Sequence, residues 1–437
     1  MRILTIAKEL GPGGTERAAQ NCTRAYRAAG HEVAVLGIDK GGSRAEAMQA
    51  EGIPVWIGGY SPAEVDAAVL QAVAWQPQFV HIHRTGHADA VSASALRRLR
   101  EAAANRLPVI ETNHFSRSDR TDDRRLIDLH IHMSEWCLWK WQQYSKGLRP
   151  APFGVVLPHL IDTTAFGRVS QPQRASRREA LGIPSGAFAF GRLGQPFGAG
   201  WSRMVFDAFE RFAPAHPDAV LVVIGLPEMY RARIAALPEA IRARVLDRPF
   251  VHGDAALRES YSALDCFLHA KQIGESFGYV LIESMLCECP VISLSTPARD
   301  NSQLEVVGHE RGGLMVTDTD SMVQAMERMH ADESLRRRLA AGGARWVREN
   351  YAWEVVAPRL LRLVELTAST NDPVALRERL RADGFVTSVS SQRVDQLMSN
   401  VMGRNRAMTR LAMRLGHQPM LYRGFVAAKR VVTRYRG

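Results

Sequence analysis

Residues 274–285 read GESFGYVLIESM, and this stretch decides how the rest of the chain is interpreted. It sets two carboxylates, Glu275 and Glu283, on either side of the point where we expect a loop to turn into a helix. Ser276 is the expected N-cap, so Glu283 would lie about two turns into that helix. The glycines let backbone N–H groups approach a diphosphate, which the helix N-terminus also attracts. Because carboxylates only accept hydrogen bonds, the pair suits the hydroxyls of a sugar and of a ribose.

Taken alone, such a pair is more often a helix cap and a solvated glutamate, so the flanking segments matter. Residues 289–293 (CPVIS) read as a buried strand, and residues 300–307 (DNSQLEVV) and 312–316 (GGLMV) follow in that order. This succession resembles the glycosyltransferases of family four, also called group 1, which carry a Glu-x7-Glu motif before a Pro-Val strand. The resemblance covers roughly residues 1–368, is strongest over 269–316, and does not extend to the C-terminal tail.

The resemblance implies an α/β chain with the GT-B fold, in which two Rossmann-like, doubly wound domains face a cleft. We expect an acceptor-side domain at 1–168 and a domain that binds the nucleotide-sugar at 169–368, with its last helix returning toward the first domain. Residues 369–437 would form a basic amphipathic helical extension. The polar stretch 170–178 is the linker candidate.

Hydrophobic patterning supports two α/β halves. The first opens with a buried strand, the turn GPGGTE, a helix and a second strand. Thr15 can cap the start of that helix, and Gly30 can end it. That order opens a parallel doubly wound sheet. Strands are expected at 2–7, 31–37, 54–57, 79–83, 108–114, 126–132 and 154–158, and then at 187–193, 219–224, 266–269, 291–294 and 313–316.

Length and composition exclude several classes of protein. A chain of 437 residues is too long for one core, and 46% apolar with 23% charged residues is typical of globular domains. No run of about 18 apolar residues suggests a membrane span, and Lys8 and Glu9 interrupt the first apolar stretch, which argues against a signal peptide. The five cysteines show no CxxC spacing, so we expect neither disulfides nor a zinc site, and a cytoplasmic location.

The net charge of +11 is concentrated in the tail. Residues 396–437 hold nine basic residues and no acidic one, so the rest of the chain is nearly neutral, which argues against a nucleic-acid groove. Arg406, Arg410 and Arg414 share one expected helix face opposite an apolar one. After a break at 416–419 a second apolar stripe follows, at Leu421, Phe425, Ala428 and Val432. Such helices suit an anionic membrane surface on the cytoplasmic side, and a helix packed on the body is the alternative.

Three positions outside the 274–285 stretch match the family residue by residue. Gly13 and Gly14 resemble the first loop, which lies over donor phosphate and acceptor in the family; a structural turn is the alternative. The loop lacks the last glycine of a dinucleotide fingerprint, which disfavours NAD. His114 ends a strand as Thr-x-His, where the family's imidazole reaches the donor sugar, although a lone histidine there is more often structural. His81 and His83 are interpreted as structural.

Arg192 follows the first strand of the second half, where the family places an Arg whose planar fork grips the diphosphate. The chain then departs from the pattern, because Gly200 stands where the family has a lysine. Arg203 or Lys271 is expected to substitute, and we favour Arg203 because it lies closest to the gap. Glu288 also replaces a family glycine, which costs about 1 kcal/mol if the backbone is left-handed there.

Together these features predict a hexosyltransferase that moves a sugar from a nucleotide-sugar to a glycan, lipid-linked or small-molecule acceptor, with retention of configuration. The nucleotide-sugar is a co-substrate and no cofactor or metal is expected, since no Asp-x-Asp or His cluster with ligand spacing stands out. A GT-B epimerase and a weakened glycan-binding scaffold remain alternatives, and a nucleic-acid binder is least favoured. The expected catalytic residues are His114 and Glu275, and the expected donor-binding residues are Gly13, Gly14, Arg192, Arg203, Gly274, Ser276, Phe277, Gly278 and Glu283.

Overall fold

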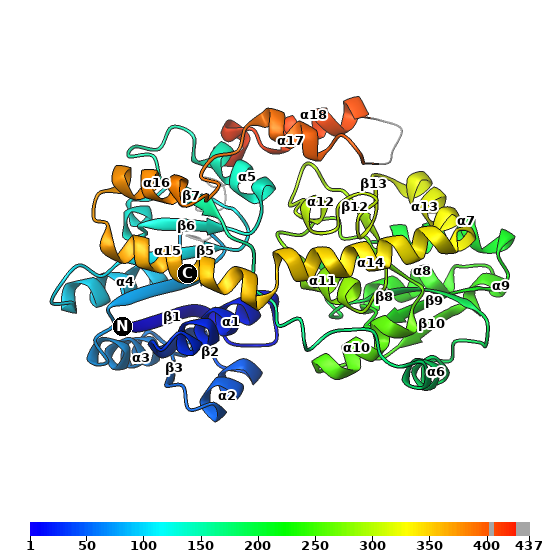
Figure 1. The fold of residues 1–437 in the computed structure, drawn as a ribbon, viewed down its shortest axis with the longest axis horizontal. Coiled ribbons are helices and arrows are strands. Elements are labelled where there is room, and N and C mark those ends of the chain that lie inside the picture. Colours follow the sequence, from blue (N-terminus) through cyan, green and yellow to red (C-terminus); the bar gives the residue numbers. More distant parts are fainter. Residues whose placement is uncertain (402–405, 425–437) are drawn as a thin grey trace. The chain divides into compact units, whose positions relative to one another are not determined.

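The structure, a computed structural model, describes residues 1–401 and 406–424, which divide into two compact units (Figure 1). Unit 1 contains Met1–Ile161, Trp353–Ser391 and the described part of 417–437. Unit 2 contains Asp162–Ala352 and Gln392–Gly416. The first boundary therefore falls at 161/162 rather than at 168/169, and the segment after 368 is divided between the units instead of forming a third one.

Unit 1 is built on a seven-stranded parallel sheet with the order β3-β2-β1-β4-β5-β6-β7. Its strands are β1 Arg2–Glu9, β2 Glu32–Lys40, β3 Val55–Ile57, β4 Phe79–Arg84, β5 Val109–Asn113, β6 Leu129–His132 and β7 Gly154–Val156. Its helices are α1 Gly14–Ala28, α2 Ser43–Ala50, α3 Pro62–Ala74, α4 Ala90–Ala102, α5 Glu135–Ser145, α15 Trp353–Ser369 and α16 Pro373–Ala382. Helices pack on both faces of the sheet, which is the predicted doubly wound arrangement.

The two faces of β1 show why helices must cover both sides. Ile3 belongs to one buried cluster together with Tyr26 of α1 and Leu360 of α15, whereas the next residue, Leu4, belongs to a second cluster with Leu96 of α4. Successive side chains of a strand point to opposite faces, so an apolar strand needs a helix layer on each side. The cluster with Leu360 also shows that α15 is part of unit 1.

Unit 2 is built on a six-stranded parallel sheet with the order β10-β9-β8-β11-β12-β13. Its strands are β8 Phe188–Leu193, β9 Ala219–Ile224, β10 Val245–Arg248, β11 Cys266–His269, β12 Val291–Leu294 and β13 Gly313–Val316. Its helices are α6 Gln171–Ala180, α7 Met204–Phe212, α8 Arg231–Ala235, α9 Glu239–Arg242, α10 Asp254–Ala263, α11 Tyr279–Leu286, α12 Gln303–Val306, α13 Thr319–Ala331 and α14 Glu333–Asn350. The prediction of two Rossmann-like α/β halves is confirmed.

Two local predictions are wrong. Thr15 does not cap α1, because the N-cap is Gly13 and the helix already begins at Gly14. Residues 170–178 are not a linker, because they form most of α6, which Ser170 and Gln173 start with a capping box. No residue of α6 is buried, so its sequence looks like a linker. Side chains such as Arg174, which bonds Asp265 at 2.7 Å, hold it to the body.

The described part of the tail contains α17 Ser391–Leu397 and α18 Arg406–Gly416. The predicted helix break after Gly416 is confirmed, and residues 419–424 are helical again. Arg410 and Arg414 are exposed, and Leu411 and Leu415 are about half exposed. Most of the predicted second apolar stripe, from Phe425 onward, lies outside the described residues.

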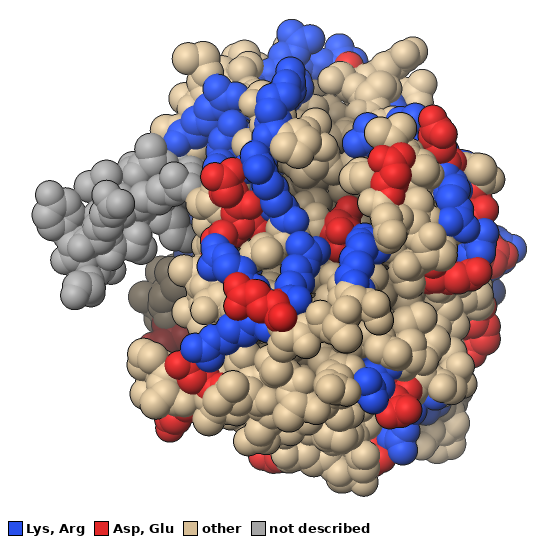
Figure 2. Space-filling view, turned by 90° about the vertical axis from the view of Figure 1, so that its left-hand side faces the viewer, with Lys and Arg blue, Asp and Glu red and all other residues tan. Residues whose placement is uncertain are grey.

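Part of the surface charge in unit 1 is paired, although Figure 2 also shows a run of Lys and Arg side chains from the top to the middle of the face that it draws. Arg98 lies 2.9 Å from Asp66, and Arg100 and Arg106 both lie 3.0 Å from Asp128. On the face in Figure 2, Lys and Arg side chains lie beside Asp and Glu side chains. Among the described residues, no helix is both long and apolar enough to cross a membrane.

Candidate active site

The loop between β11 and α11 carries the GESFG run, and two glycines fix its path. Gly274 has a φ of +71°, and a Cβ there would lie 1.6 Å from the carbonyl oxygen of Asp300, so no side chain fits. Gly278, with a φ of +91°, is the N-cap of α11. Ser276 is therefore not the N-cap, contrary to the prediction. The helix begins at Tyr279, and Glu283 lies about one turn into it rather than two.

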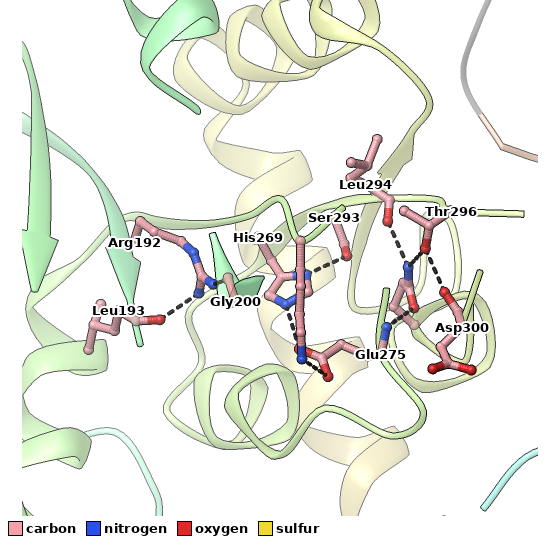
Figure 3. Close-up of polar contacts among 11 residues, drawn as sticks. Arg192, Leu193, Gly200, His269, Glu275, Ser293, Leu294, Thr296 and Asp300 are labelled. Atoms are coloured by element: carbon pink, nitrogen blue, oxygen red, sulfur yellow. Dashed lines mark hydrogen bonds and ion pairs between the residues drawn. The ribbon is translucent and has the colours of Figure 1, made fainter. Parts of the chain in front are cut away.

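Glu275 is the centre of a charged hydrogen-bond network (Figure 3). Its Oε1 lies 3.1 Å from Nε2 of His269, and its Oε2 lies 3.0 Å from Nζ of Lys271. Burial alone would raise the pKa of Glu275, but the charge of Lys271 and the contacts with His269 hold that pKa at about 2. The carboxylate is thus ionised at neutral pH, and its oxygens face cationic and N–H groups.

Residues beyond the motif hold His269 and the backbone of Glu275 in place. Oγ of Ser293 lies 3.1 Å from Nδ1 of His269. Burial lowers the pKa of His269, although Glu275 opposes the shift, so the imidazole is neutral. Its Nε2–H then donates to Glu275 and its Nδ1 accepts from Ser293. The Oε1 of Gln303 accepts from the backbone N–H of Glu275 at 3.1 Å, and its Nε2 donates to the carbonyl oxygen of Leu294 at 2.8 Å.

Arg192, at the end of β8, is bonded to the protein's own backbone. Its Nη2 donates to the carbonyl oxygen of Gly200 at 2.6 Å, its Nη1 donates to that of Leu193, and its Nε is buried without a hydrogen bond. The guanidinium lies 4.8 Å from the ring centre of Trp201. Burial lowers the pKa of Arg192 to about 10, with Glu275 opposing the shift. The side chain stays cationic at neutral pH and clamps the loop in which Gly200 replaces the family lysine.

The two expected substitutes for that lysine lie in different surroundings. Arg203 precedes α7, its side chain is 67% exposed, and its Nε donates to Asp207 of the same helix at 2.9 Å. Lys271 instead contacts Glu275, whose charge also acts on Arg192. Of the two, Lys271 is the one that the described structure joins to the Glu275 network.

The remaining donor-side residues have structural contacts of their own. Glu283 is buried, and its Oε2 accepts from the hydroxyl of Tyr261 at 3.3 Å. Burial raises the pKa of Tyr261 well above its usual value, and Glu283 adds to this. Phe277 packs edge-on against Tyr351, with ring centres 5.4 Å apart. Ser276 is partly buried in the same loop.

Gly13, Gly14 and His114 belong to unit 1. Gly13 is in extended conformation at the start of α1, and a Cβ there would lie 2.2 Å from the carboxylate of Glu16. His114 follows β5, and its Nε2 lies 3.2 Å from Nδ1 of His83. Burial lowers the pKa of His114 to about 3, against an opposing effect of Glu111. The predicted functional histidine and a histidine interpreted as structural are therefore in direct contact.

His83 and His114 are members of a buried column of imidazoles. The ring of His83 also stacks on that of His81 at 4.2 Å, and the ring of His114 lies 5.1 Å from that of His159. Both ring nitrogens of His81 are bonded, Nδ1 to the hydroxyl of Tyr26 and Nε2 to that of Thr112, each at 2.8 Å. Sequence reasoning missed His159 and the column, because its members come from three separate segments.

Part of the chain is similar in sequence to known proteins. Residues 203–346 match the family described as Glycosyl transferases group 1. A phosphatidyl-myo-inositol mannosyltransferase of Mycobacterium leprae is 30% identical over 178 residues, which cover 39% of this chain and 44% of that protein. The chain thus matches less than half of that relative's length.

Solved structures show the fold over most of the chain. Anabaena Alr3699/HepE in complex with UDP and glucose superposes with a TM-score of 0.66 at 18% identity, covering 84% of this chain and 99% of that one. WaaG, a glycosyltransferase involved in lipopolysaccharide biosynthesis, superposes with a TM-score of 0.58 at 15% identity, covering 83% and 99%. The predicted GT-B fold is confirmed, and the resemblance to group 1 glycosyltransferases is confirmed over the matched residues.

Proposed function

We propose that this chain, which contains a group 1 glycosyltransferase domain on a GT-B fold, transfers a hexose from a nucleotide-sugar to a glycan, lipid-linked or small-molecule acceptor. The proposal is supported by the UDP and glucose bound to the Anabaena protein and by the mannosyltransferase activity in the name of the mycobacterial relative. Retention of anomeric configuration and independence of metal are part of the proposal.

The observation that carries it is the charge arrangement around Glu275. An ionised carboxylate at the carboxyl end of β11 is held between Lys271 and His269, and Arg192 at the carboxyl end of the neighbouring strand β8 is within its electrostatic reach. Open α/β sheets bind ligands at the carboxyl ends of their strands. A fixed anion beside two cations suits a ligand that carries both hydroxyls and phosphates.

Each group then has a defined task. The carboxylate of Glu275 accepts hydrogen bonds from sugar hydroxyls, because its two oxygens have more acceptor sites than His269 and Lys271 use. Lys271 and Arg192 stabilise the negative charge that develops on the departing diphosphate, and the N-terminus of α11 adds a partial positive charge. Preorganised cations of this kind do the work that a metal ion does in other transferases.

The contacts of Arg192 favour one rival. Both of its terminal nitrogens donate to backbone carbonyl oxygens, and the family lysine is replaced by Gly200. A catalytically weakened scaffold that binds a nucleotide-sugar without turning it over would show the same features. A GT-B epimerase would convert the nucleotide-sugar without any acceptor.

Calorimetry against UDP-, GDP- and ADP-sugars, followed by NMR of the products, separates these functions. We expect one nucleotide-sugar to bind and to be consumed only when an acceptor is present, with the anomeric configuration kept. Binding without turnover under any acceptor would support the scaffold, an isomerised nucleotide-sugar would support the epimerase, and no binding at all would refute the proposal.

Peripheral membrane binding through the tail is a separate part of the proposal, and α18 supports it. Arg410 and Arg414 are exposed beside the half-exposed Leu411 and Leu415. Such a helix binds anionic lipid through both charge and apolar area. We expect R410Q/R414Q to weaken sedimentation with anionic liposomes, while R345Q/R348Q, two exposed arginines of α14, should not. Equal binding by both double variants would contradict this part.

A further inference from the structure

A second polar cluster lies in unit 2, at the amino end of the sheet and thus at the opposite strand ends from Glu275. His216 and Asp218 come just before β9, and Glu327 and His330 lie one turn apart on α13. No histidine cluster with ligand spacing stands out in the sequence, because these two pairs are separated by about a hundred residues. Folding of α13 beside the start of β9 brings them together.

The four side chains form two imidazole–carboxylate pairs that face each other. Nε2 of His216 lies 2.7 Å from Oε2 of Glu327, and Nε2 of His330 lies 2.9 Å from Oδ2 of Asp218. The two imidazole ring centres are 4.5 Å apart. Ligand atoms of His216, Asp218 and His330 all lie within 4.8 Å of one another.

We propose that this cluster is a binding site for a divalent transition-metal ion, with two imidazole nitrogens and two carboxylates as ligands. Imidazole with carboxylate is a ligand set that suits Zn²⁺ and its neighbours, with ligand distances of about 2.0–2.2 Å. His216, Asp218 and His330 already have ligand atoms close together, whereas Glu327 would have to rotate to join them. The two carboxylate side chains are 45% and 54% exposed, which leaves them room to turn. The same exposure gives the ion a path from solvent.

The imidazoles are already oriented for this task. The ring of His216 stacks on Phe212 at 4.0 Å, and the ring of His330 packs against Phe188 at 5.1 Å. Both histidine side chains are only 18% exposed, so the apolar contacts fix their directions. A bound ion would tie α13 to the segment before β9 and so stabilise unit 2, at a distance from the chemistry.

A buried alternative within the described residues is less suited. Cys22, His81 and His83 also bring three ligand atoms together. Both ring nitrogens of His81, however, are bonded to Tyr26 and Thr112, so a metal would have to break a buried hydrogen bond. In the cluster on α13 a metal would replace two imidazole–carboxylate hydrogen bonds, but neither is fully buried and both carboxylates are themselves proposed ligands.

The test is Zn²⁺ titration of the full chain, without a histidine tag and after dialysis against a chelator, in competition with a chromogenic chelator. We expect one equivalent to bind, Co²⁺ to give ligand-field absorption bands, and Zn²⁺ to raise the unfolding temperature. No uptake by the native protein would overturn the proposal.

Two sets of variants assign the site. D218N/E327Q keeps hydrogen-bond acceptors for the two imidazoles but removes both anionic ligands, so we expect at least about tenfold weaker Zn²⁺ binding with an unchanged circular-dichroism spectrum. H252A removes an exposed histidine of unit 2 outside the cluster and should leave affinity unchanged. Unaltered affinity in D218N/E327Q, or loss of binding in C22S, would show that the ion binds elsewhere and would overturn the assignment.

Discussion

At the carboxyl end of its sheet, unit 1 holds a column of uncharged imidazoles beside one buried ion pair, Arg84 with Glu111, whereas unit 2 gathers fixed charges around one neutral imidazole, His269. His81 and His114 are buried with pKa values of about 3 and are neutral at physiological pH. In unit 2, Glu275 has a pKa of about 2 and Arg192 one of about 10, so both are charged. Two parallel sheets of the same class thus differ in the balance of neutral and charged polar groups at corresponding strand ends.

The difference teaches how burial acts on a polar group with and without a partner of opposite charge. Burial favours the neutral form of every group. The imidazoles bond mainly to hydroxyls and to one another, and the charge of Glu111, which acts on His114, is too weak to restore theirs. Glu275 stays charged because Lys271 lies 3.0 Å away. Neutral imidazoles suit hydroxyl recognition, and paired charges suit a diphosphate.

The largest expected effect concerns acid stability. Unfolded histidine has a pKa of about 6.5, so each buried imidazole with a folded pKa near 3 loses stability as pH falls below 6.5. At pH 5 this amounts to about 2 kcal/mol for each of His81 and His114. Glu275 contributes stability that is lost only as pH falls below about 4.5. After correction for the pH dependence of intrinsic amide exchange, hydrogen exchange at pH 7 and pH 5 should therefore show a larger loss of protection in unit 1 than in unit 2, where His269 is the buried imidazole with a lowered pKa. An equal loss of protection in both units would contradict the comparison.

Next in size is the removal of the anion at Glu275. E275Q keeps the shape but loses the charge that balances Lys271 and Arg192, and we expect kcat/KM with the preferred nucleotide-sugar to fall about 10²- to 10³-fold. E239Q, at an exposed glutamate of α9, is the matched control and should keep its rate. A kcat/KM of E275Q close to that of E239Q would show that the charge of Glu275 does not contribute to transfer.

A smaller effect separates the two candidate cations. K271M removes the charge that holds down the pKa of Glu275, so this pKa should rise and transfer should slow about ten- to a hundredfold. R203M should change the rate less than about threefold, because Arg203 bonds its own helix and is exposed. The acid limb of the pH–rate profile should move to higher pH in K271M only. The reverse ranking would restore Arg203 as the substitute.

The smallest expected effect is a gain in stability. Glu288 has a φ of +55°, as the missing family glycine suggested, and its partner Arg168 lies 3.7 Å away on the exposed surface. E288G should relieve left-handed strain and stabilise unit 2 by about 1 kcal/mol, less the added flexibility of the unfolded chain. Urea titration measures the free energy of unfolding. A lower value for E288G than for the unchanged protein would mean that the ion pair outweighs the strain.

The sequence was most informative where one local pattern determines one local structure. Apolar runs predicted every strand of both sheets except β10, because a strand buried on both faces must be apolar throughout, whereas β10 is only partly buried. The left-handed position at Glu288 followed from a glycine expected there. The position of the α11 cap did not follow from the sequence, since Ser276 and Gly278 are both suitable caps by residue type and the helix begins after the second.

What the sequence did not reveal are contacts between distant segments. The sequence shows that Gln303 is polar but not which group it bonds. Its hydrogen bond to the backbone of Glu275 forms because two segments distant in sequence lie side by side. Lys271 and Arg203 were equally eligible by type, and proximity in sequence favoured the one that the structure leaves on the surface. Side-chain partners are set by the sheet order, which no local pattern encodes.

All five cysteines are buried thiols, two in unit 1 and three in unit 2. Burial raises the pKa of Cys22 and of Cys287 to about 12, so neither forms a reactive thiolate in the native state. Alkylating reagents should then modify each thiol only when its surroundings open. The rate at which each native cysteine is alkylated thus reports how often its own unit opens. A single surface cysteine introduced for a fluorescent dye would be labelled in the native state without removal of any native cysteine.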